Sequence, residues 1–331
     1  MVEPILFGTV IISFLVTFIV MPLWIKKAKQ IDLVWEDMNK PHKERNVAGS
    51  GGVVVILGTL VGIFLYIAIQ TFYFKSSDGN LVTLFALVSS LFLVTGVGLI
   101  DDLFGWKRGG LSIRSRLILV LFSAVPLMVI NAGNSVVLGI NFGLLYPLII
   151  VPLGIVGATT TYNFLAGFNG LEARQGILIL TALSFVAYIH GQGWLSLVAL
   201  IMVASLIAFY VFNRNPSRVF PGDTMTYAIG LMIASIAILG GIEKIAILFF
   251  IPYIIEMILK SRGRLKKHSF GKPNPDGSLE LPYDKIYGLE HLAIKILKKI
   301  KRNHKAYEKD VVNLINLFQL IIIVLVLIFT V

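Results

Sequence analysis

Long, nearly uninterrupted apolar segments constrain the fold of this chain more than any other feature. A helix needs about 20 apolar residues to cross the hydrocarbon core of a bilayer. With 56% hydrophobic residues, 14% charged residues and a mean hydropathy of +0.85, the 331-residue chain is far more apolar than a soluble domain. We therefore expect an all-α polytopic membrane protein, a single domain over residues 1–331 with ten transmembrane helices. The expected spans lie near 4–25, 51–73, 81–100, 113–131, 143–161, 175–190, 194–212, 224–240, 243–260 and 311–330.

The first apolar segment, ILFGTVIISFLVTFIVMPLWI at 5–25, has neither a basic n-region nor a small-residue cleavage site. It is also longer than the apolar core of a signal peptide, so we expect a retained helix. The chain contains no cysteine, which excludes disulfides and thiolate metal sites.

The distribution of basic residues predicts the orientation of the helices. Of the 29 lysines and arginines, 27 fall on alternate loops, at 26–50, 101–116, 162–174, 213–223 and 260–310. Cytoplasmic loops carry such an excess, so we expect both termini to face outward and these five loops to face the cytoplasm. The net charge of +11 then belongs to one membrane face, where it would attract anionic lipids or phosphorylated substrates instead of nucleic acid.

The polar clusters lie on the same predicted face, which favours an interfacial active site over a transporter with polar residues at mid-membrane. The first cluster is Asp101 and Asp102, in VGLIDDLFGW after the third span. One aspartate in a bilayer costs about 2.5–3.5 kcal/mol on insertion scales, and intramembrane acids are functional by default. Adjacent helical residues point about 100° apart, so one carboxylate can approach a metal or hydroxyl while the other orients a cation. A helix end neutralised by nearby arginines is the structural alternative.

The second cluster follows the fifth span, in TTTYNFLAGFNGLE at 159–172. Amide side chains such as those of Asn163 and Asn169 offer donors and an acceptor without the burial cost of a charge. They suit a Mg²⁺ site or the edge of a nucleobase, and Gly167 would let the backbone approach a ligand closely. A glycine-bearing helix C-cap with incidental asparagines is the alternative.

The third cluster is FNRNPSRVFPGDT at 212–224, where a turn-forming Pro-Gly pair places Asp223 at or near the start of the eighth span. N-capping is one role for this carboxylate. The other is coordination of a Mg²⁺ ion that bridges two phosphates, in a loop that also contains Arg214 and Arg218. The residues alone do not separate the two roles.

The fourth cluster lies in the long loop 260–310, where basic residues crowd together: Arg262, Arg264, Lys266, Lys267 and His268. Such cations clamp pyrophosphate in phosphoryl transfer or form a polybasic lipid-binding patch. Further along, apolar residues recur at helical spacing over 284–302, with lysines on the other face. This pattern predicts an interfacial amphipathic helix before the last span.

Taken together, these motifs resemble the polyprenyl-phosphate N-acetylhexosamine-1-phosphate transferase family (glycosyltransferase 4 type). The resemblance covers nearly the whole chain, in the order PHKER…GSGG, the aspartate pair, NFLAGFNGLE, NPSRVFPGDT and the basic loop. NFLAGFNGLE and PSRVFPGDT are closest to the dolichyl-phosphate branch and its archaeal relatives. The peptidoglycan branch carries a triple-histidine stretch in its last cytoplasmic loop, where this chain has Lys266, Lys267 and the single His268. A bacterial undecaprenyl-phosphate GlcNAc-1-phosphate transferase stays open as an alternative.

The resemblance implies transfer of N-acetylglucosamine-1-phosphate from UDP-GlcNAc to a polyprenyl or dolichyl phosphate, with UMP as the second product. This is the first step of lipid-linked oligosaccharide assembly for N-glycosylation. Mg²⁺ or Mn²⁺ would be the cofactor, and a homodimer is compatible with the resemblance. The sequence does not decide between a single displacement and a covalent aspartyl intermediate. A transporter or flippase is the alternative from another class, but neither symmetric halves nor mid-span polar residues support it.

The resemblance also implies roles for particular residues. The catalytic carboxylates would be Asp101, Asp102 and Asp223, and the metal ligands Asn163 and Asp223. The substrate-binding residues would be Gly167, Asn169, Glu172, Lys107, Arg262, Arg264, Lys266, Lys267 and His268. The chain departs from the eukaryotic branch at Ala48-Gly49, where that branch has proline-glutamate, and this leaves sugar recognition through that acid open.

Overall fold

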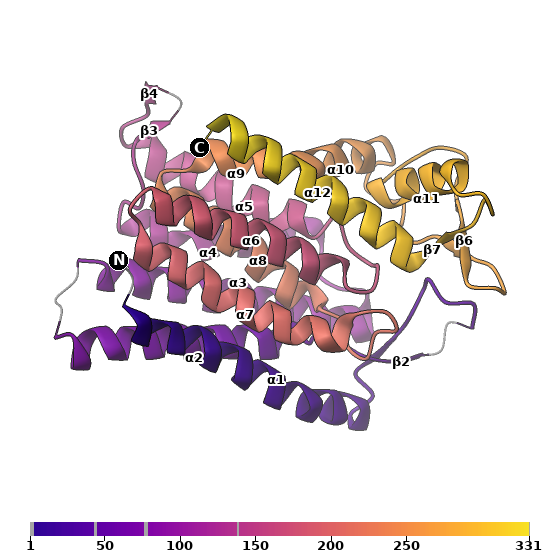
Figure 1. Ribbon diagram of the computed structural model, residues 1–331, viewed down its shortest axis with the longest axis horizontal. Helices are drawn as coiled ribbons and strands as arrows, with labels where there is room; N and C mark the ends of the chain where they lie inside the picture. The colour runs from indigo at the N-terminus through magenta and orange to yellow at the C-terminus, as the bar shows by residue number, and fades with distance from the viewer. Residues whose placement is uncertain (1–2, 43–44, 76–78, 138, 331) are drawn as a thin grey trace.

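The computed structural model describes residues 3–42, 45–75, 79–137 and 139–330, with the side chains of Arg45, Lys107 and Arg108 excepted. The chain forms an elongated bundle of helices that run alongside one another (Figure 1). Both ends of the chain lie at one end of this bundle. The opposite end carries most of the non-helical segments and is called the loop end below.

The bundle is built from helices with short loops and few strands. The helices are α1 (Phe7–Gln30), α2 (Gly52–Ala68), α3 (Leu81–Arg108), α4 (Ile113–Val129), α5 (Val151–Tyr162), α6 (Leu171–Ile189), α7 (Gly193–Asn213), α8 (Gly222–Gly240), α9 (Glu243–Phe249), α10 (Ile251–Arg262), α11 (Leu289–Ile300) and α12 (Glu308–Thr330). A 3₁₀ turn, η1 (Pro4–Leu6), precedes α1, and π-helical turns follow α2 and precede α5 at η2 (Ile69–Tyr73) and η3 (Tyr146–Ile150).

The strands form three small antiparallel sheets, ordered β1-β2, β3-β4 and β5-β6-β7. Their bounds are β1 (Val34–Glu36), β2 (Arg45–Ala48), β3 (Val136–Val137), β4 (Ile140–Asn141), β5 (Lys272–Pro273), β6 (Ser278–Glu280) and β7 (Ala306–Tyr307).

Within the described residues, seven helices are long and apolar enough to cross a membrane: Pro4–Gln30, Gly52–Tyr73, Leu81–Trp106, Leu171–Ile189, Gly193–Asn213, Gly222–Gly240 and Glu308–Thr330. Each coincides with an expected span, so the chain is a multi-pass, predominantly helical membrane protein. The other expected spans, 113–131, 143–161 and 243–260, correspond to α4, to η3 with α5, and to α9 with α10. The last of these is divided at Phe250, because Pro252 lacks the N–H that would continue the helix. Ten spans and their orientation stay predictions.

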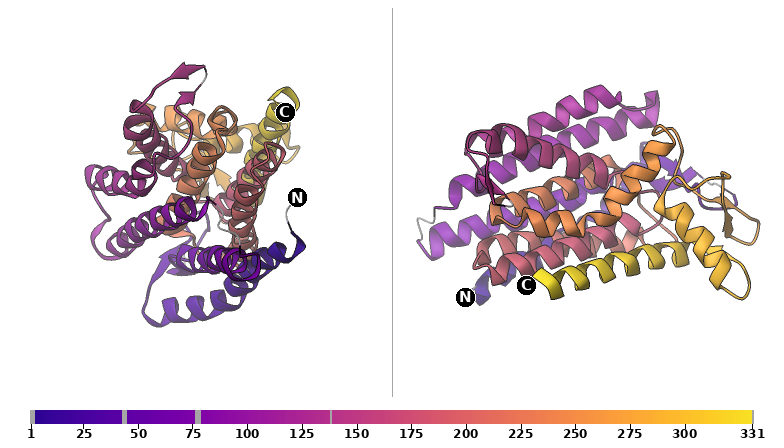
Figure 2. Two further views of the ribbon diagram at one scale, coloured as in Figure 1. Left: turned by 90° about the vertical axis from the view of Figure 1, so that its left-hand side faces the viewer. Right: turned by 90° about the horizontal axis from the view of Figure 1, so that it is seen from above.

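Helix α8 occupies the centre of the bundle. Of its most apolar stretch, 83% is buried inside the protein, compared with 28% for α1 and 39% for α12. It packs against α3, α5, α2, α6 and α9. Helices α1 and α12 run along the outside, where their apolar side chains are free to meet lipid (Figure 2).

A glycine lets α3 approach the start of α8. A Cβ atom at Gly98 would lie 2.6 Å from the Cα atom of Thr224, far inside van der Waals contact. At Gly96, two positions earlier on α3, a Cβ atom would meet nothing within 4 Å. Only glycine fits at position 98, and the close approach places the end of α3 beside the first turn of α8.

Two segments far apart in the sequence are joined at the loop end by a parallel bridge between Ala48 and Val219. The N–H of Phe220 donates to the carbonyl of Ala48 at 2.8 Å, and the N–H of Gly51 donates to the carbonyl of Phe220 at 2.9 Å. These bonds anchor the segment that follows β2 to the turn that precedes α8.

Helix α11 lies within 284–302, where the sequence predicts an interfacial amphipathic helix, and part of its apolar side is buried in the protein. Leu289 and Ile294 on its apolar side are at most 5% exposed, and the helix packs against α10, α12 and β7. Glu256 of α10 caps it, since its Oε2 accepts a hydrogen bond from the N–H of Leu289 at 2.6 Å. The apolar side thus packs against the protein, and its lysines and Ile300, which is 73% exposed, are left to meet a membrane surface.

Replacing Gly98 by alanine should destabilise the folded protein, because the added methyl group forces α3 away from α8. We expect a loss of about 1–3 kcal/mol, the usual cost of overpacking a core, measured as a lower thermal unfolding midpoint in detergent. The matched control is Gly96→Ala on the same helix, which should leave the midpoint unchanged or raise it. Equal losses in both variants would contradict the close-approach explanation.

Candidate active site

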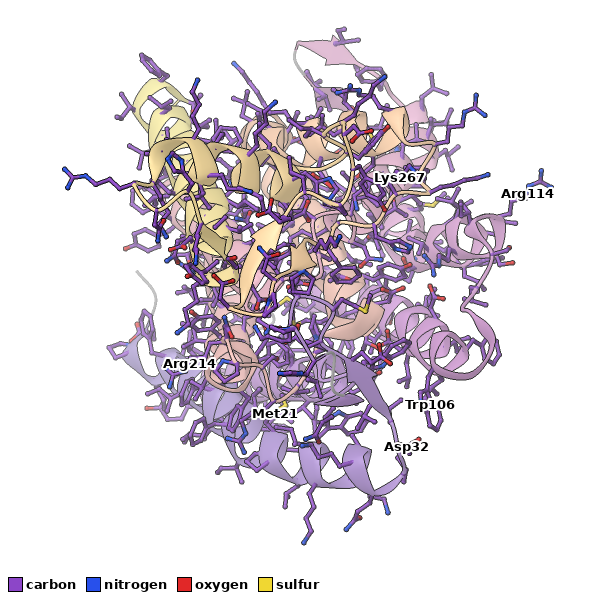
Figure 3. The ribbon with its side chains drawn as sticks, turned by 90° about the vertical axis from the view of Figure 1, so that its right-hand side faces the viewer. Met21, Asp32, Trp106, Arg114, Arg214 and Lys267 are labelled. Carbon is purple, nitrogen blue, oxygen red and sulfur yellow. The ribbon has the colours of Figure 1, made fainter. Side chains whose placement is uncertain are left out.

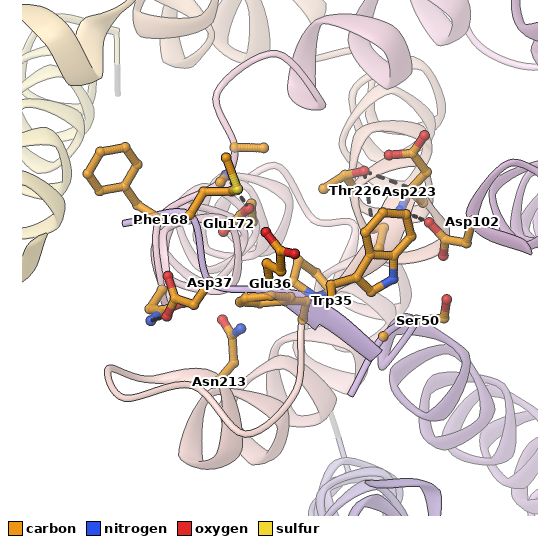
Figure 4. A pocket seen from close by; sticks show the side chains of 18 of the residues that line it. Trp35, Glu36, Asp37, Ser50, Asp102, Phe168, Glu172, Asn213, Asp223 and Thr226 are labelled. Atoms are coloured by element: carbon orange, nitrogen blue, oxygen red, sulfur yellow. Dashed lines mark hydrogen bonds between the residues drawn. The ribbon is translucent and has the colours of Figure 1, made fainter. Parts of the chain in front are cut away.

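A cavity of about 640 Å³ lies at the loop end, between the ends of α3 and α5 and the starts of α6 and α8 (Figure 4). The segment around β1 forms a further wall. So does the turn before α8, which the Ala48–Val219 bridge joins to β2. Several of the residues predicted from the sequence line this cavity together: Asp102, Asn163, Gly167, Asn169, Glu172, Asp223 and His268.

Asp102 caps helix α8 from the neighbouring helix α3. Its Oδ1 accepts a hydrogen bond from the backbone N–H of Asp223 at 2.6 Å, and its Oδ2 accepts from the hydroxyl of Thr224 at 2.7 Å. The first N–H groups of a helix have no partner inside it, and the helix dipole favours a negative charge there. Gly222 leaves room for this contact, because a Cβ atom at that position would collide with the Asp102 carboxylate.

The cap supplied by Asp102 frees the carboxylate of Asp223, for which the sequence allowed either capping or metal binding. Oδ1 of Asp223 accepts a hydrogen bond from Nδ2 of Asn163 at 3.1 Å, and its Oδ2 lies 3.9 Å from Nη2 of Arg116. The amide oxygen of Asn163 in turn accepts from the hydroxyl of Thr226 at 2.9 Å. Asp223 and Asn163 are therefore held side by side at the cavity wall (Figure 4).

Asp101 does not line the cavity and is 2% exposed. Its carboxylate forms an ion pair with Arg116 and accepts a hydrogen bond from the hydroxyl of Tyr227 at 3.3 Å. Because adjacent positions on a helix point in different directions, the two carboxylates contact different partners. Asp102 faces α8 and the cavity, whereas Asp101 holds Arg116, the cation that faces Asp223.

The segment between α5 and α6 turns at Gly167, whose φ is +107°. The N–H of Gly167 donates to Oε1 of Glu172 at 2.8 Å, and a Cβ atom at this position would lie 2.7 Å from the ring of Phe270. Glu172 is 4% exposed, and within the described residues its Oε2 has no hydrogen-bond partner. At this turn the cavity is therefore lined by the backbone of Gly167 and by the buried carboxylate of Glu172.

Asn169 is fixed by a buried polar network. Its Nδ2 donates to Oδ2 of Asp37 at 2.8 Å, and its backbone N–H donates to Oε1 of Glu308 at 2.8 Å. Lys40 forms an ion pair with Glu308. The network ties the loop after β1 and the start of α12 to the segment that contains Asn169.

The basic residues of the long loop do not all line the cavity. His268 lines the cavity, whereas Arg262, Arg264, Lys266 and Lys267 are exposed at the same end of the molecule and do not line it. Lys267, labelled in Figure 3, places its ammonium group 4.6 Å from the ring centroid of Tyr283. The side chain of Lys107 lies outside the described residues.

The cavity also uses residues that the sequence analysis did not select. Trp35, Glu36 and Asp37 line it from β1 and the turn that follows, and Phe220 and Phe270 contribute aromatic rings. The sequence did contain a signal for Trp35, Glu36 and Asp37, because the polar run WEDMNK at 35–40 lies on the loop after the first span, which is predicted to be cytoplasmic. The charges of that loop were used only to predict orientation.

The donor set at this wall fits a hard divalent cation. Mg²⁺ is usually bound by one or two carboxylates together with substrate phosphates and water. Asp223 provides a carboxylate at this wall, and the neighbouring Asn163 provides an amide whose nitrogen donates to Asp223 and whose oxygen accepts from Thr226. Across the described part of the chain, no group of three or more His, Cys, Asp or Glu could hold a metal ion. The residues therefore suit an ion completed by phosphate and water, and not an all-protein metal cage.

Comparison with known proteins finds relatives that match most of the chain. The sequence pattern of glycosyl transferase family 4 matches residues 84–241. A protein of Saccharolobus solfataricus is 34% identical over 294 residues, 87% of either chain, and one of Sulfolobus acidocaldarius is 32% identical over 303 residues, 89% of either chain. Both carry the provisional name UDP-N-acetylglucosamine--dolichyl-phosphate N-acetylglucosaminephosphotransferase. A phospho-N-acetylmuramoyl-pentapeptide-transferase of Halalkalibacterium halodurans is 32% identical over 275 residues, 78% of this chain and 82% of its own.

Similarity at this level spans the bundle and the cavity together, and is not confined to a single motif. The class of the molecule is accordingly that of a membrane-embedded transferase. Within this class, the chain belongs to glycosyl transferase family 4, as an enzyme of the GlcNAc-1-phosphate transferase type. The resemblance predicted from the motifs is confirmed.

Replacing Asp102 by alanine should lower the stability of the fold, because the first turn of α8 loses its only described carboxylate cap. We expect a loss of about 1–2 kcal/mol, as for other N-caps, measured as a lower thermal unfolding midpoint in detergent. Asp223→Asn keeps an oxygen for the Asn163 amide and should leave the midpoint nearly unchanged. If Asp223→Asn destabilised the protein more than Asp102→Ala, the assignment of the cap would be wrong.

Proposed function

We propose that the protein transfers N-acetylglucosamine-1-phosphate from UDP-GlcNAc to a polyprenyl or dolichyl phosphate and releases UMP. The observation that carries this proposal is the pairing of Asp223 with Asn163, beside Asp102, in a cavity at the helix ends. The names of the two archaeal relatives support it. We expect this cavity to face the cytoplasm, where sugar nucleotides are available, because basic residues crowd the loops at this end.

The cavity has the size and lining expected of a site for a nucleotide sugar. Its volume of about 640 Å³ falls within the usual range for small-molecule pockets. Trp35, Phe220 and Phe270 offer apolar ring faces for a nucleobase or sugar ring. The absence of a side chain at Gly167 lets the ring of Phe270 pack against the turn that lines the cavity.

The acceptor needs little activation. A phosphate monoester has its second pKa near 6, so most of the lipid phosphate is already a dianion at neutral pH. One of its oxygens attacks the β-phosphorus of UDP-GlcNAc, the bond from that phosphorus to the bridging oxygen breaks, and UMP leaves. A single displacement therefore suffices, without a covalent aspartyl intermediate.

The chain's own residues supply position and charge for this step. We assign Asp223 and Asn163 as ligands of Mg²⁺ or Mn²⁺, which when bound neutralises charge on the phosphates. Arg116, held by Asp101, keeps a positive charge next to this wall. Asp102 holds the first turn of α8 so that Asp223 faces the cavity. In this proposal Asp101 and Asp102 are positioning residues.

A bacterial undecaprenyl-phosphate GlcNAc-1-phosphate transferase uses the same chemistry on another acceptor. A muramoyl-pentapeptide donor is disfavoured, because His268 is a single histidine in its part of the long loop. Comparing UDP-GlcNAc with UDP-MurNAc-pentapeptide, and dolichyl with undecaprenyl phosphate, separates these substrates.

The purified protein should release UMP from UDP-GlcNAc when Mg²⁺ and a polyprenyl phosphate are both present. Asp223→Asn should lower the rate about a hundredfold or more, since it removes charge at the reacting phosphates. Asp276→Asn is the matched control, an exposed aspartate paired with Lys305 at 2.6 Å, and should keep the parental rate. No UMP release with any polyprenyl phosphate tested would refute the proposal.

Removal of divalent metal should abolish the reaction reversibly. Because Asp223 and Asn163 provide only two ligands, we expect loose binding, so dialysis against EDTA should suffice to remove the ion. Mg²⁺ or Mn²⁺ should restore UMP release, measured by coupled assay, whereas Ca²⁺, which prefers longer bonds and more ligands, should restore less. Full activity in EDTA would show that the oxygen pair has another role.

A further inference from the structure

A second cavity, of about 660 Å³, lies at the loop end between the start of α6, the end of α7 and the start of α12. Asn169 lines both cavities. The second one carries four cations, contributed by three different parts of the chain: Arg174, Arg214, Arg218 and Lys309. Among the described residues that line it, none is acidic.

These four cations are not neutralised by described residues. No ion pair joins any of them to a described acid. Nη1 of Arg174 donates to the amide oxygen of Asn313 at 2.6 Å, and the guanidinium of Arg218 lies 5.3 Å from the ring centroid of Phe212. Both partners are uncharged, so the positive charge of the cavity persists.

The position of two of these cations adds to this charge. Arg174 is the fourth residue of α6 and Lys309 the second residue of α12. Helix N-termini carry a partial positive charge that disfavours cations and favours anions. The acid that begins α12, Glu308, is already engaged by Lys40 and by the N–H of Asn169. The cavity thus combines four cations with the starts of two helices, whose first-turn acids Glu172, Glu308 and Asp310 do not line it.

We propose that this second cavity binds a phosphate group, carried by the headgroup of an anionic phospholipid or by a soluble phosphate compound. Guanidinium groups match the oxygens of phosphate with paired hydrogen bonds, and a lysine adds a point charge. Figure 3 shows Arg214 at the loop end, on the side opposite Arg114. The proposal does not rest on the transferase reaction, because binding here needs neither sugar nucleotide nor turnover.

A bound phosphate would also support the neighbouring cavity. The segment between α5 and α6 forms the wall shared by the two cavities through Asn169. A ligand that holds Arg174 at the start of α6 fixes this segment from the side opposite the catalytic cavity. Occupancy should therefore raise the thermal unfolding midpoint of the whole protein.

The test titrates the full-length protein in neutral detergent, without sugar nucleotide, and records the thermal unfolding midpoint. The probes are inorganic phosphate, dihexanoyl-phosphatidylglycerol and, as the zwitterionic control, dihexanoyl-phosphatidylcholine. The variant Arg214→Gln/Lys309→Gln removes two exposed cations for which no described contact of the side chain exists. The charge-matched control is Lys27→Gln/Arg114→Gln, which removes one lysine and one arginine that do not line the cavity.

We expect phosphate, phosphatidylglycerol or both to raise the midpoint of the parent and of the control variant, and phosphatidylcholine to have no effect. The concentration for half-maximal effect should rise about thirtyfold in Arg214→Gln/Lys309→Gln, since two cations near an anionic group together contribute roughly 2 kcal/mol. Stabilisation by phosphatidylglycerol alone identifies a lipid headgroup, and stabilisation by inorganic phosphate identifies a soluble ligand.

Asn313→Asp is a second variant, in which the hydrogen bond from Arg174 is kept but a negative charge enters the cavity. It should weaken the response in the same direction. The proposal is overturned if neither anionic probe raises the midpoint of the parent, or if the cavity variants and the charge-matched control respond equally.

Discussion

The contact between the carboxylate of Asp102 and the first turn of α8 sets the geometry of the whole site. Helix α8 is the most enclosed of the seven candidate spans, and its first N–H groups have no partner inside the helix. Leaving such groups unpaired costs about 1–3 kcal/mol each. Because α3 supplies the cap, Asp223 does not have to cap its own helix, and its carboxylate stays at the cavity wall beside Asn163.

Similar ties between neighbouring elements recur at the loop end. Glu256 of α10 caps α11 through the N–H of Leu289, as Asp102 caps α8. In a bilayer, apolar contact alone does not drive helices together, and close packing and polar contacts between helices take a larger part. Gly98 provides the close packing between α3 and α8, and the carboxylate provides the polar contact. Asp102 therefore has two roles, because it joins α3 to α8 and also lines the cavity.

The sequence predicted the helical class, the places of the spans and the gathering of acids and amides at one end, because apolar length and basic loops carry that information. It could not predict which of Asp101 and Asp102 faces the cavity, because that depends on where Arg116 and α8 lie in space. It missed Trp35 and its neighbours, which reach the cavity only because β1 pairs with β2 and β2 is bridged to the turn before α8. It predicted the amphipathic helix α11 but not that α10, α12 and β7 pack against it, and its interfacial position stays a prediction.

The position of Trp35 gives a physical reason why this chain has Ala48-Gly49 where the eukaryotic branch has proline-glutamate. A Cβ atom at Gly49 would lie 2.7 Å from Nε1 of Trp35, and the carbonyl of Gly49 accepts a hydrogen bond from the indole N–H of Trp24 at 2.9 Å. An acidic side chain at this position would therefore need Trp35 to move. Beside Gly49 the cavity wall of this chain is aromatic, with Glu36 as an adjacent acid that lines the cavity. In the proposed reaction Trp35 would offer its ring face to the sugar, and selectivity for hydroxyl groups would have to come from neighbouring polar residues.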